Sequence, residues 1–166
     1  MIEIEVPGRG TQRLKHLVLD VNGTIALDGQ LIEGVAQRLA ELRRSVEVHL
    51  LTADTRGQQQ AIDAQLDTKA TRIAPDAPVH ARRGCESEAA QKASFVRGLG
   101  NRNVCAVGNG ANDAQMLREA ALAIAVLGKE GLAVETLNAA DVVVRDVSDA
   151  LDLLLNPLRL AATWRR

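Results

Sequence analysis

One segment of the chain, LVLDVNGTIALDG at residues 17–29, carries a carboxylate directly after an apolar run. Asp20 is expected at the carboxyl end of a buried strand, exposed at the mouth of a sheet, with Gly23 and Thr24 turning the chain sharply. Asp or Asn followed by Gly also forms ordinary turns, so this segment alone does not establish a site. A calcium-binding EF-hand loop is excluded, because its sixth position requires Gly and this chain has Ile25 there.

A second segment, VCAVGNGANDAQML at residues 104–117, joins an apolar run to a glycine-rich turn. Asn109, Asn112 and Asp113 offer oxygen donors of the hard kind that Mg²⁺ prefers. The two glycines resemble part of a dinucleotide fingerprint, but Asp113 takes the third glycine position, and its charge would repel a pyrophosphate. The segment therefore favours a cation.

Two single residues complete the set that could do chemistry. Thr52 ends the run VEVHLLT, where its hydroxyl could donate to a phosphate oxygen or simply cap a helix. Lys92 belongs to the helical pattern SEAAQKASFVRGLG, where a lone lysine is normally a solvated surface residue. A nucleophile, a phosphate donor, a cation and a metal site together suffice for phosphoryl transfer.

The elements that must position these residues follow from the apolar pattern. Short runs such as LVLD, VCAVG and LAIAV alternate with longer segments of helical period, which predicts βαβ repetition and a parallel sheet covered by helices on both faces. Ligands in such folds bind at the carboxyl ends of the strands. Residues 2–6 alternate apolar and acidic before PGRG, which predicts an N-terminal β-hairpin. The tail NPLRLAATWRR is read as a packing helix, a dimer contact or a frayed end, with packing favoured.

The amino-acid composition argues against several classes of ligand and site. The chain of 166 residues has a formal charge of −1, one Phe, one Trp and no Tyr, so nucleic acid is an unexpected ligand. It shows no signal-peptide pattern and no run that would span a membrane, which predicts a cytoplasmic protein. Cys85 and Cys105 are isolated from each other and from any His cluster, which argues against a cysteine zinc site or a redox pair. Cys105 is expected in the core.

In chain order, Asp20 with Gly23 and Thr24, then Thr52, then Lys92 and then GNGANDAQML resemble the first to fourth motifs of the haloacid dehalogenase (HAD) superfamily. The match covers nearly the whole chain, and GNGANDAQML is most similar to the GDGxND segment of P-type ATPase phosphorylation domains. The resemblance implies a Rossmann-like three-layer α/β fold with an HAD-like core, and a soluble P-type ATPase-like phosphatase. It also implies Mg²⁺ as cofactor and an aspartyl phosphate on Asp20 as intermediate.

The resemblance also assigns roles to individual residues. The implied catalytic residues are Asp20, Asn22, Thr52 and Lys92. The implied phosphate-binding residues are Val21, Asn22, Gly23, Thr52, Ala53 and Lys92. The implied metal ligands are Asp20, the main-chain carbonyl of Asn22, Asn109 and Asp113.

Two positions depart from the family pattern. Most HAD phosphatases carry a second Asp two residues after the nucleophile, as the acid and base, and this chain has Asn22. An amide does not exchange a proton near neutral pH, so a contribution of roughly 10²- to 10⁴-fold in rate should be largely absent. Asn109 replaces the first Asp of GDGxND, which removes a negative charge and should weaken Mg²⁺ binding.

The spacing of the motifs leaves no room for a cap domain, so residues 1–166 are predicted to form a single capless HAD-like domain. An open active site would suit a phosphorylated small molecule or macromolecule, or a cleft completed by a neighbouring subunit of a homo-oligomer. No nucleic acid and no membrane partner are expected.

Two other functions stay open. Asn22 and Asn109 together are compatible with a degenerate HAD domain that binds phosphate or a partner without turnover. A two-component receiver domain also combines Asp, Thr, Lys and Mg²⁺, but its phosphoacceptor lies mid-chain, whereas Asp20 ends the first predicted parallel strand. Labelling of Asp113 or Asp54 by acetyl phosphate would favour the receiver.

Overall fold

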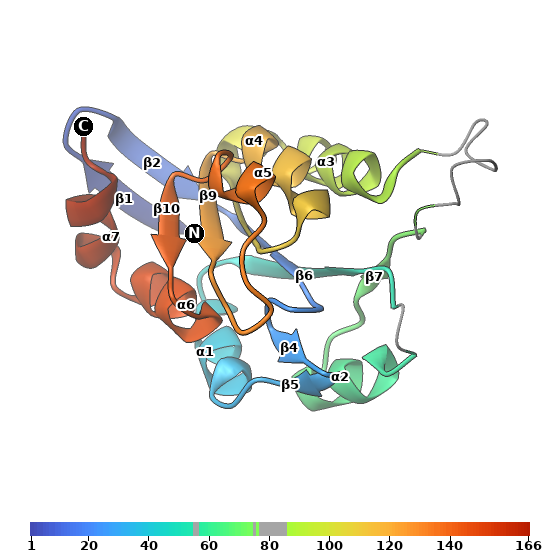
Figure 1. Cartoon of the computed structure of the whole chain (residues 1–166). Coiled ribbons are helices and arrows are strands. Elements are labelled where there is room, and N and C mark those ends of the chain that lie inside the picture. Colours follow the sequence, from blue (N-terminus) through green and yellow to red (C-terminus); the bar gives the residue numbers. More distant parts are fainter. Residues whose placement is uncertain (55–56, 75, 77–85) are drawn as a thin grey trace.

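The computed structural model describes residues 1–54, 57–74, 76 and 86–166. Its centre is a six-stranded sheet in the order β10-β9-β8-β3-β6-β7, in which every neighbouring pair is parallel (Figure 1). The strands are β3 (His16–Asp20), β6 (Glu47–Thr52), β7 (Thr71–Arg72), β8 (Val104–Gly108), β9 (Leu122–Val126) and β10 (Val142–Val144). The predicted parallel sheet is confirmed.

Helices cover both faces of this sheet, as predicted, and alternate residues of β3 show how. Leu17 and Leu19 belong to one buried cluster, which also holds apolar residues of four helices on one face. Val18 points the other way, into a second cluster with apolar residues of two helices on the opposite face. The helices of the first cluster are α1 (Val35–Leu42), α2 (Gln59–Leu66), α6 (Val147–Leu155) and α7 (Pro157–Trp164), and those of the second are α3 (Glu88–Gly98) and α4 (Ala114–Glu119).

The shorter elements lie around this three-layer core. The predicted N-terminal hairpin is present, with β1 (Ile2–Val6) antiparallel to β2 (Gly10–Leu14). A second, very small hairpin follows β3. The remaining elements are β4 (Ala26–Leu27), β5 (Gln30–Leu31), α5 (Val134–Leu137) and the 3-10 turns at Asn101–Asn103 and Ala111–Asp113.

Helix α5 is short and covers only Val134–Leu137. Gly131 has a φ of 89°, which a right-handed helix cannot contain, so the helix begins only at Val134. Across the described segments no helix has the length and apolar character that crossing a membrane requires. Cys105 is buried, as expected, while Cys85 lies outside the described residues.

The C-terminal tail forms a packing helix. Trp164 of α7 is only 2% exposed, and α7 lies against β1. The guanidinium of Arg9 lies 5.1 Å from the centroid of the Trp164 ring, and Arg9 Nε donates to the Trp164 carbonyl at 2.9 Å. Of the three interpretations of the tail, the structure supports packing.

We expect Trp164→Ala to lower the free energy of unfolding by about 3 to 5 kcal/mol, because it removes a large buried side chain and the ring beneath Arg9. Leu158→Ala is a matched control on the same helix, since Leu158 is 87% exposed, and it should change stability by less than about 0.5 kcal/mol. Urea unfolding measures both. Equal effects of the two substitutions would show that α7 is not docked.

Candidate active site

Asp20 lies at the carboxyl edge of the six-stranded sheet, at the end of β3, which is the first of its strands in chain order. Strand β3 lies between β6 and β8, and Asp20 is its last residue, opposite Leu51 of β6. The chain then turns at Gly23, whose φ is 79°. A Cβ atom on Gly23 would lie 2.4 Å from a carboxylate oxygen of Glu130 and 2.8 Å from the Asn109 amide, so glycine is required for conformation and for space.

The loop after β8 fixes a second carboxylate. Asp113 is fully buried, and its Oδ2 accepts the main-chain N–H groups of Asn109 and Gly110, each at 3.0 Å. The carboxylate folds back over Gly108, where a Cβ atom would lie 2.6 Å from Asp113 Cγ. The loop therefore uses one oxygen of Asp113 for its own structure and directs the other into the site.

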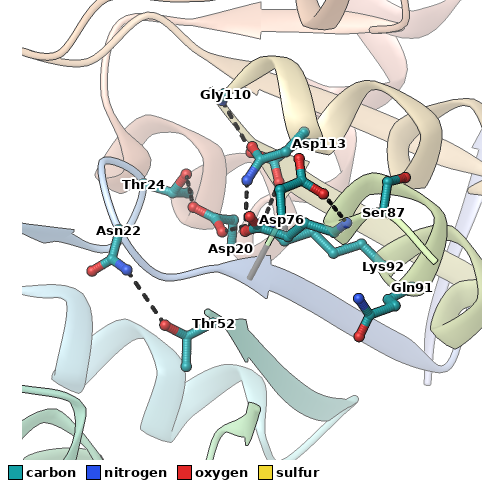
Figure 2. Close-up of polar contacts among 12 residues, drawn as sticks. Asp20, Asn22, Thr24, Thr52, Asp76, Ser87, Gln91, Lys92, Gly110 and Asp113 are labelled. Atoms are coloured by element: carbon teal, nitrogen blue, oxygen red, sulfur yellow. Dashed lines mark hydrogen bonds and ion pairs between the residues drawn. The ribbon is translucent and has the colours of Figure 1, made fainter. Parts of the chain in front are cut away.

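Lys92 joins these two carboxylates. It lies in the first half of α3, which is capped by Ser87, whose side chain accepts the Ala90 N–H at 3.1 Å. The Lys92 ammonium donates to Asp20 Oδ1 at 2.7 Å and to Asp113 Oδ1 at 2.8 Å, and Lys92 is 0% exposed (Figure 2). The expectation that a lone lysine here would be solvated is wrong, because α3 directs it into the sheet edge.

Negative charge exceeds positive charge in this cluster. Glu88 Oε1 lies 3.6 Å from the Lys92 ammonium, so three carboxylates surround one lysine. Burial and then repulsion from Asp113 raise the pKa of Asp20 to about 7, although Lys92 and Thr24 act in the opposite direction. Burial lowers the pKa of Lys92, but the attraction of Asp20 and Asp113 outweighs it and raises that pKa above its usual value.

Thr24 connects the first motif to the fourth. Its hydroxyl lies 3.2 Å from Asp20 Oδ2 and 3.0 Å from Asn109 Oδ1, and Thr24 is 1% exposed. The sequence indicated only a turn at Thr24. Its contact with Asn109 could not be foreseen, because the two residues are 85 positions apart.

Thr52 and Asn22 form a second pair, on the other side of Asp20 in Figure 2. Thr52 Oγ1 accepts the Asp54 N–H at 3.0 Å and the Asn22 side-chain amide at a long 3.4 Å. Both lone pairs of the hydroxyl are then engaged, so its own hydrogen is available for an acceptor such as a phosphate oxygen. Asn22 therefore contacts Thr52, a role that the sequence did not indicate.

Three other residues with implied phosphate contacts lie beside these. The N–H of Val21 donates to the Leu51 carbonyl at 3.2 Å, and that of Gly23 to the Ala26 carbonyl at 2.8 Å. These two donors are used within the fold. Ala53 directly follows Thr52 and is half-buried.

A cavity of about 440 Å³ adjoins the first motif. Gly23 and Thr24 line it together with Leu27, Lys129 and Asp146, among others. Its volume falls within the range of roughly 300 to 1,000 Å³ that small-molecule sites occupy. An organic group attached to a phosphate at Asp20 could therefore lie here.

The residues at this edge fit a divalent cation such as Mg²⁺. Asp20, Asp113 and Asn109 supply carboxylate and amide oxygens, which are the ligands Mg²⁺ prefers. The buried carboxylates outnumber the one buried lysine, so a cation would relieve their repulsion. The side chains of Thr52 and Lys92 would remain free to contact an anion beside that cation.

Comparisons with known proteins agree with the fold described above. The chain is 51% identical over 65 residues to an uncharacterised protein of Methanocaldococcus jannaschii, in a match covering 39% of this chain and 70% of that protein. Its fold is similar to 3-deoxy-D-manno-octulosonate 8-phosphate phosphatase of Moraxella catarrhalis, solved with magnesium, phosphate and KDO, with a TM-score of 0.63, 17% identity and coverage of 92% and 94%.

A P-type ATPase is also among the similar structures. A zinc-transporting PIB-type ATPase in its E2.Pi state matches with a TM-score of 0.57 and 25% identity, over 81% of this chain and 20% of the ATPase. The family model for haloacid dehalogenase-like hydrolases matches residues 4–121. The chain therefore belongs to the haloacid dehalogenase-like hydrolase family.

Proposed function

We propose that this chain is a Mg²⁺-dependent phosphohydrolase that forms an aspartyl phosphate on Asp20. The observation that carries the proposal is the buried contact of one ammonium, that of Lys92, with both Asp20 and Asp113 at 2.7 and 2.8 Å. Such a cluster is costly to bury and stabilises a fold weakly, so its presence at the carboxyl edge of the sheet favours function.

In the first step a carboxylate oxygen of Asp20 attacks phosphorus, and the bond between phosphorus and the leaving oxygen breaks. The ammonium of Lys92 and the hydroxyl of Thr52 donate to oxygens of the transferring group. The leaving oxygen takes its proton from solvent, because Asn22 cannot supply one. In the second step water attacks phosphorus and gives up a proton to solvent, the bond between phosphorus and the Asp20 oxygen breaks, and inorganic phosphate and the Asp20 carboxylate are released. Asp20, Asp113, Asn109 and the Asn22 carbonyl would hold Mg²⁺, which neutralises charge on the phosphoryl oxygens and offsets their repulsion by Asp20.

Asn22 favours a slow reaction. Its side chain donates to Thr52, and it cannot protonate the leaving oxygen. The presence of Asn22 in place of an acid also favours the alternative, which is a degenerate domain that binds phosphate without turnover.

Hydrolysis of an aryl phosphate tests the proposal directly. The wild-type chain should release phosphate in the presence of Mg²⁺ and lose this activity on addition of EDTA. Asp20→Asn should abolish it, whereas Asp28→Asn, an exposed residue of the same segment, should not. If the Asp20→Asn variant released phosphate as fast as the wild type does, Asp20 would not be the nucleophile.

Lys92→Met should destabilise the protein by about 3 to 5 kcal/mol, because it leaves two buried carboxylates without their partner. Lys69→Met is the matched control, since Lys69 is exposed. Mg²⁺ should recover part of the lost stability in Lys92→Met by supplying positive charge to Asp20 and Asp113. Urea unfolding with and without Mg²⁺ measures this, and unchanged stability would mean that the ion cluster does not form in solution.

Asn22→Asp should raise turnover by up to about 10²- to 10⁴-fold, because a carboxyl two residues beyond Asp20 can protonate the leaving oxygen. The gain should be largest for alkyl phosphates, whose poor leaving groups need that proton, and smaller for aryl phosphates. Asn22→Ala is the control that removes the contact with Thr52 without adding an acid. Turnover at background in Asn22→Asp on both substrates would favour the non-catalytic alternative.

A further inference from the structure

Three side chains with metal-binding groups meet at the amino edge of the central strands. Glu47 and His49 are two residues apart on β6 and therefore share a face. His16 begins β3 and is paired with Glu47 in the parallel register, while His49 is paired with Val18. The cluster lies on the face that α3 covers. The centroid of the His49 ring lies 5.5 Å from that of Phe95, which belongs to α3.

The separations of the potential ligand atoms match those of a tetrahedral site. His16 Nδ1 lies 3.2 Å from His49 Nε2 and 3.4 Å from Glu47 Oε2, while His49 Nε2 lies 3.9 Å from Glu47 Oε1. Ligands about 2.0 to 2.1 Å from a tetrahedral ion lie about 3.3 Å from one another. The two Glu47 distances involve different oxygens, but one ligand atom from each side chain lies within 4.8 Å of the others, so movement of the exposed Glu47 carboxylate could bring three ligand atoms around one ion.

The surroundings suit coordination by neutral imidazoles. The side chains of His16 and His49 are 19% and 14% exposed, and that of Glu47 is 68% exposed. Burial lowers the pKa of His49, so its ring is neutral near pH 7 and offers a lone pair to a metal. The exposed side of Glu47 leaves room for water as a fourth ligand.

We propose that His16, Glu47 and His49 bind a first-row transition-metal ion, Zn²⁺ in the first instance, at a site separate from Asp20. Two imidazoles and one carboxylate are a ligand set that Zn²⁺ accepts in proteins. Mg²⁺ prefers a shell of oxygen ligands and should remain with the carboxylates at the opposite edge. Asp20 is four positions after His16 on β3, which corresponds to about 13 Å.

The bound ion would connect two strands that are adjacent in the sheet and distant in sequence. Without it, the two rings form a hydrogen bond with each other, and each ring lies within 4 Å of a Glu47 carboxylate oxygen. A zinc titration distinguishes the two arrangements, because a metal site takes up Zn²⁺ and a cluster that is only hydrogen-bonded does not.

The experiment is a calorimetric titration of the full chain with Zn²⁺ in a large excess of Mg²⁺, which occupies the oxygen-ligand site. The wild type should bind one Zn²⁺ at the cluster and show a higher Tm with Zn²⁺ than without it. With Co²⁺ as the probe, a tetrahedral site should give strong visible absorption.

Four variants locate the site. His16→Gln and His49→Gln should each weaken Zn²⁺ binding by about 100-fold or more, since loss of an outer partner alone typically costs roughly 10- to 100-fold. Glu47→Gln should also weaken it, and its exposed side chain makes it the variant that retains the fold if either His variant does not. The control, His80→Ala with Cys85→Ser, removes the third histidine of the sequence and the cysteine other than the buried Cys105, and it should leave the cluster's Zn²⁺ affinity unchanged.

Zinc binding that is equal in the wild type and in folded Glu47→Gln, His16→Gln and His49→Gln would overturn the proposal. Loss of the bound zinc in the control or in Asp20→Asn would assign the ion to another site and would also overturn it. No measurable Zn²⁺ binding by the wild type would leave only the hydrogen-bonded cluster.

Discussion

One ammonium group shared between two buried carboxylates is the contact on which the active edge of this protein depends. Lys92 brings α3 to the end of β3 through Asp20 and to the loop after β8 through Asp113. Removing any one of the three would leave buried charge without a partner. The loop itself depends on the same contact, because the second oxygen of Asp113 holds the N–H groups of Asn109 and Gly110.

This contact also explains why the site would favour a cation and, beside it, a phosphoryl group. The cluster, together with Glu88, holds more negative than positive charge, and the raised pKa of Asp20 is the consequence of burial and of Asp113. A hard cation would complete the charge balance, and a phosphoryl group would then meet Lys92 and Thr52. Helix α3 serves both edges of the sheet, since Lys92 lies at the carboxyl edge and Phe95 lies against His49 towards the amino edge.

The sequence was sufficient where a local pattern determines the structure. Apolar runs predicted the strands, and the position of Asp20 at the end of one of them predicted the edge at which the candidate site lies. Lys92 could not be identified as buried from its own helix, because only the packing of α3 on the sheet determines which way it points. The contacts of Thr24 with Asn109, of Asn22 with Thr52 and of His16 with His49 join distant segments and depend on strand register. The single-domain organisation, the cytoplasmic location and the partners stay predictions.

A structure of the chain with Mg²⁺ and beryllium fluoride, a mimic of the phosphoryl group, tests the central claim most directly. We predict that the beryllium is bonded to a carboxylate oxygen of Asp20, that Lys92 and Thr52 donate to its fluorides, and that Mg²⁺ lies between Asp20 and Asp113. Beryllium fluoride bonded to Asp54 or Asp113, or a structure in which Asp20 remains paired only with Lys92 while the mimic binds elsewhere, would contradict the account.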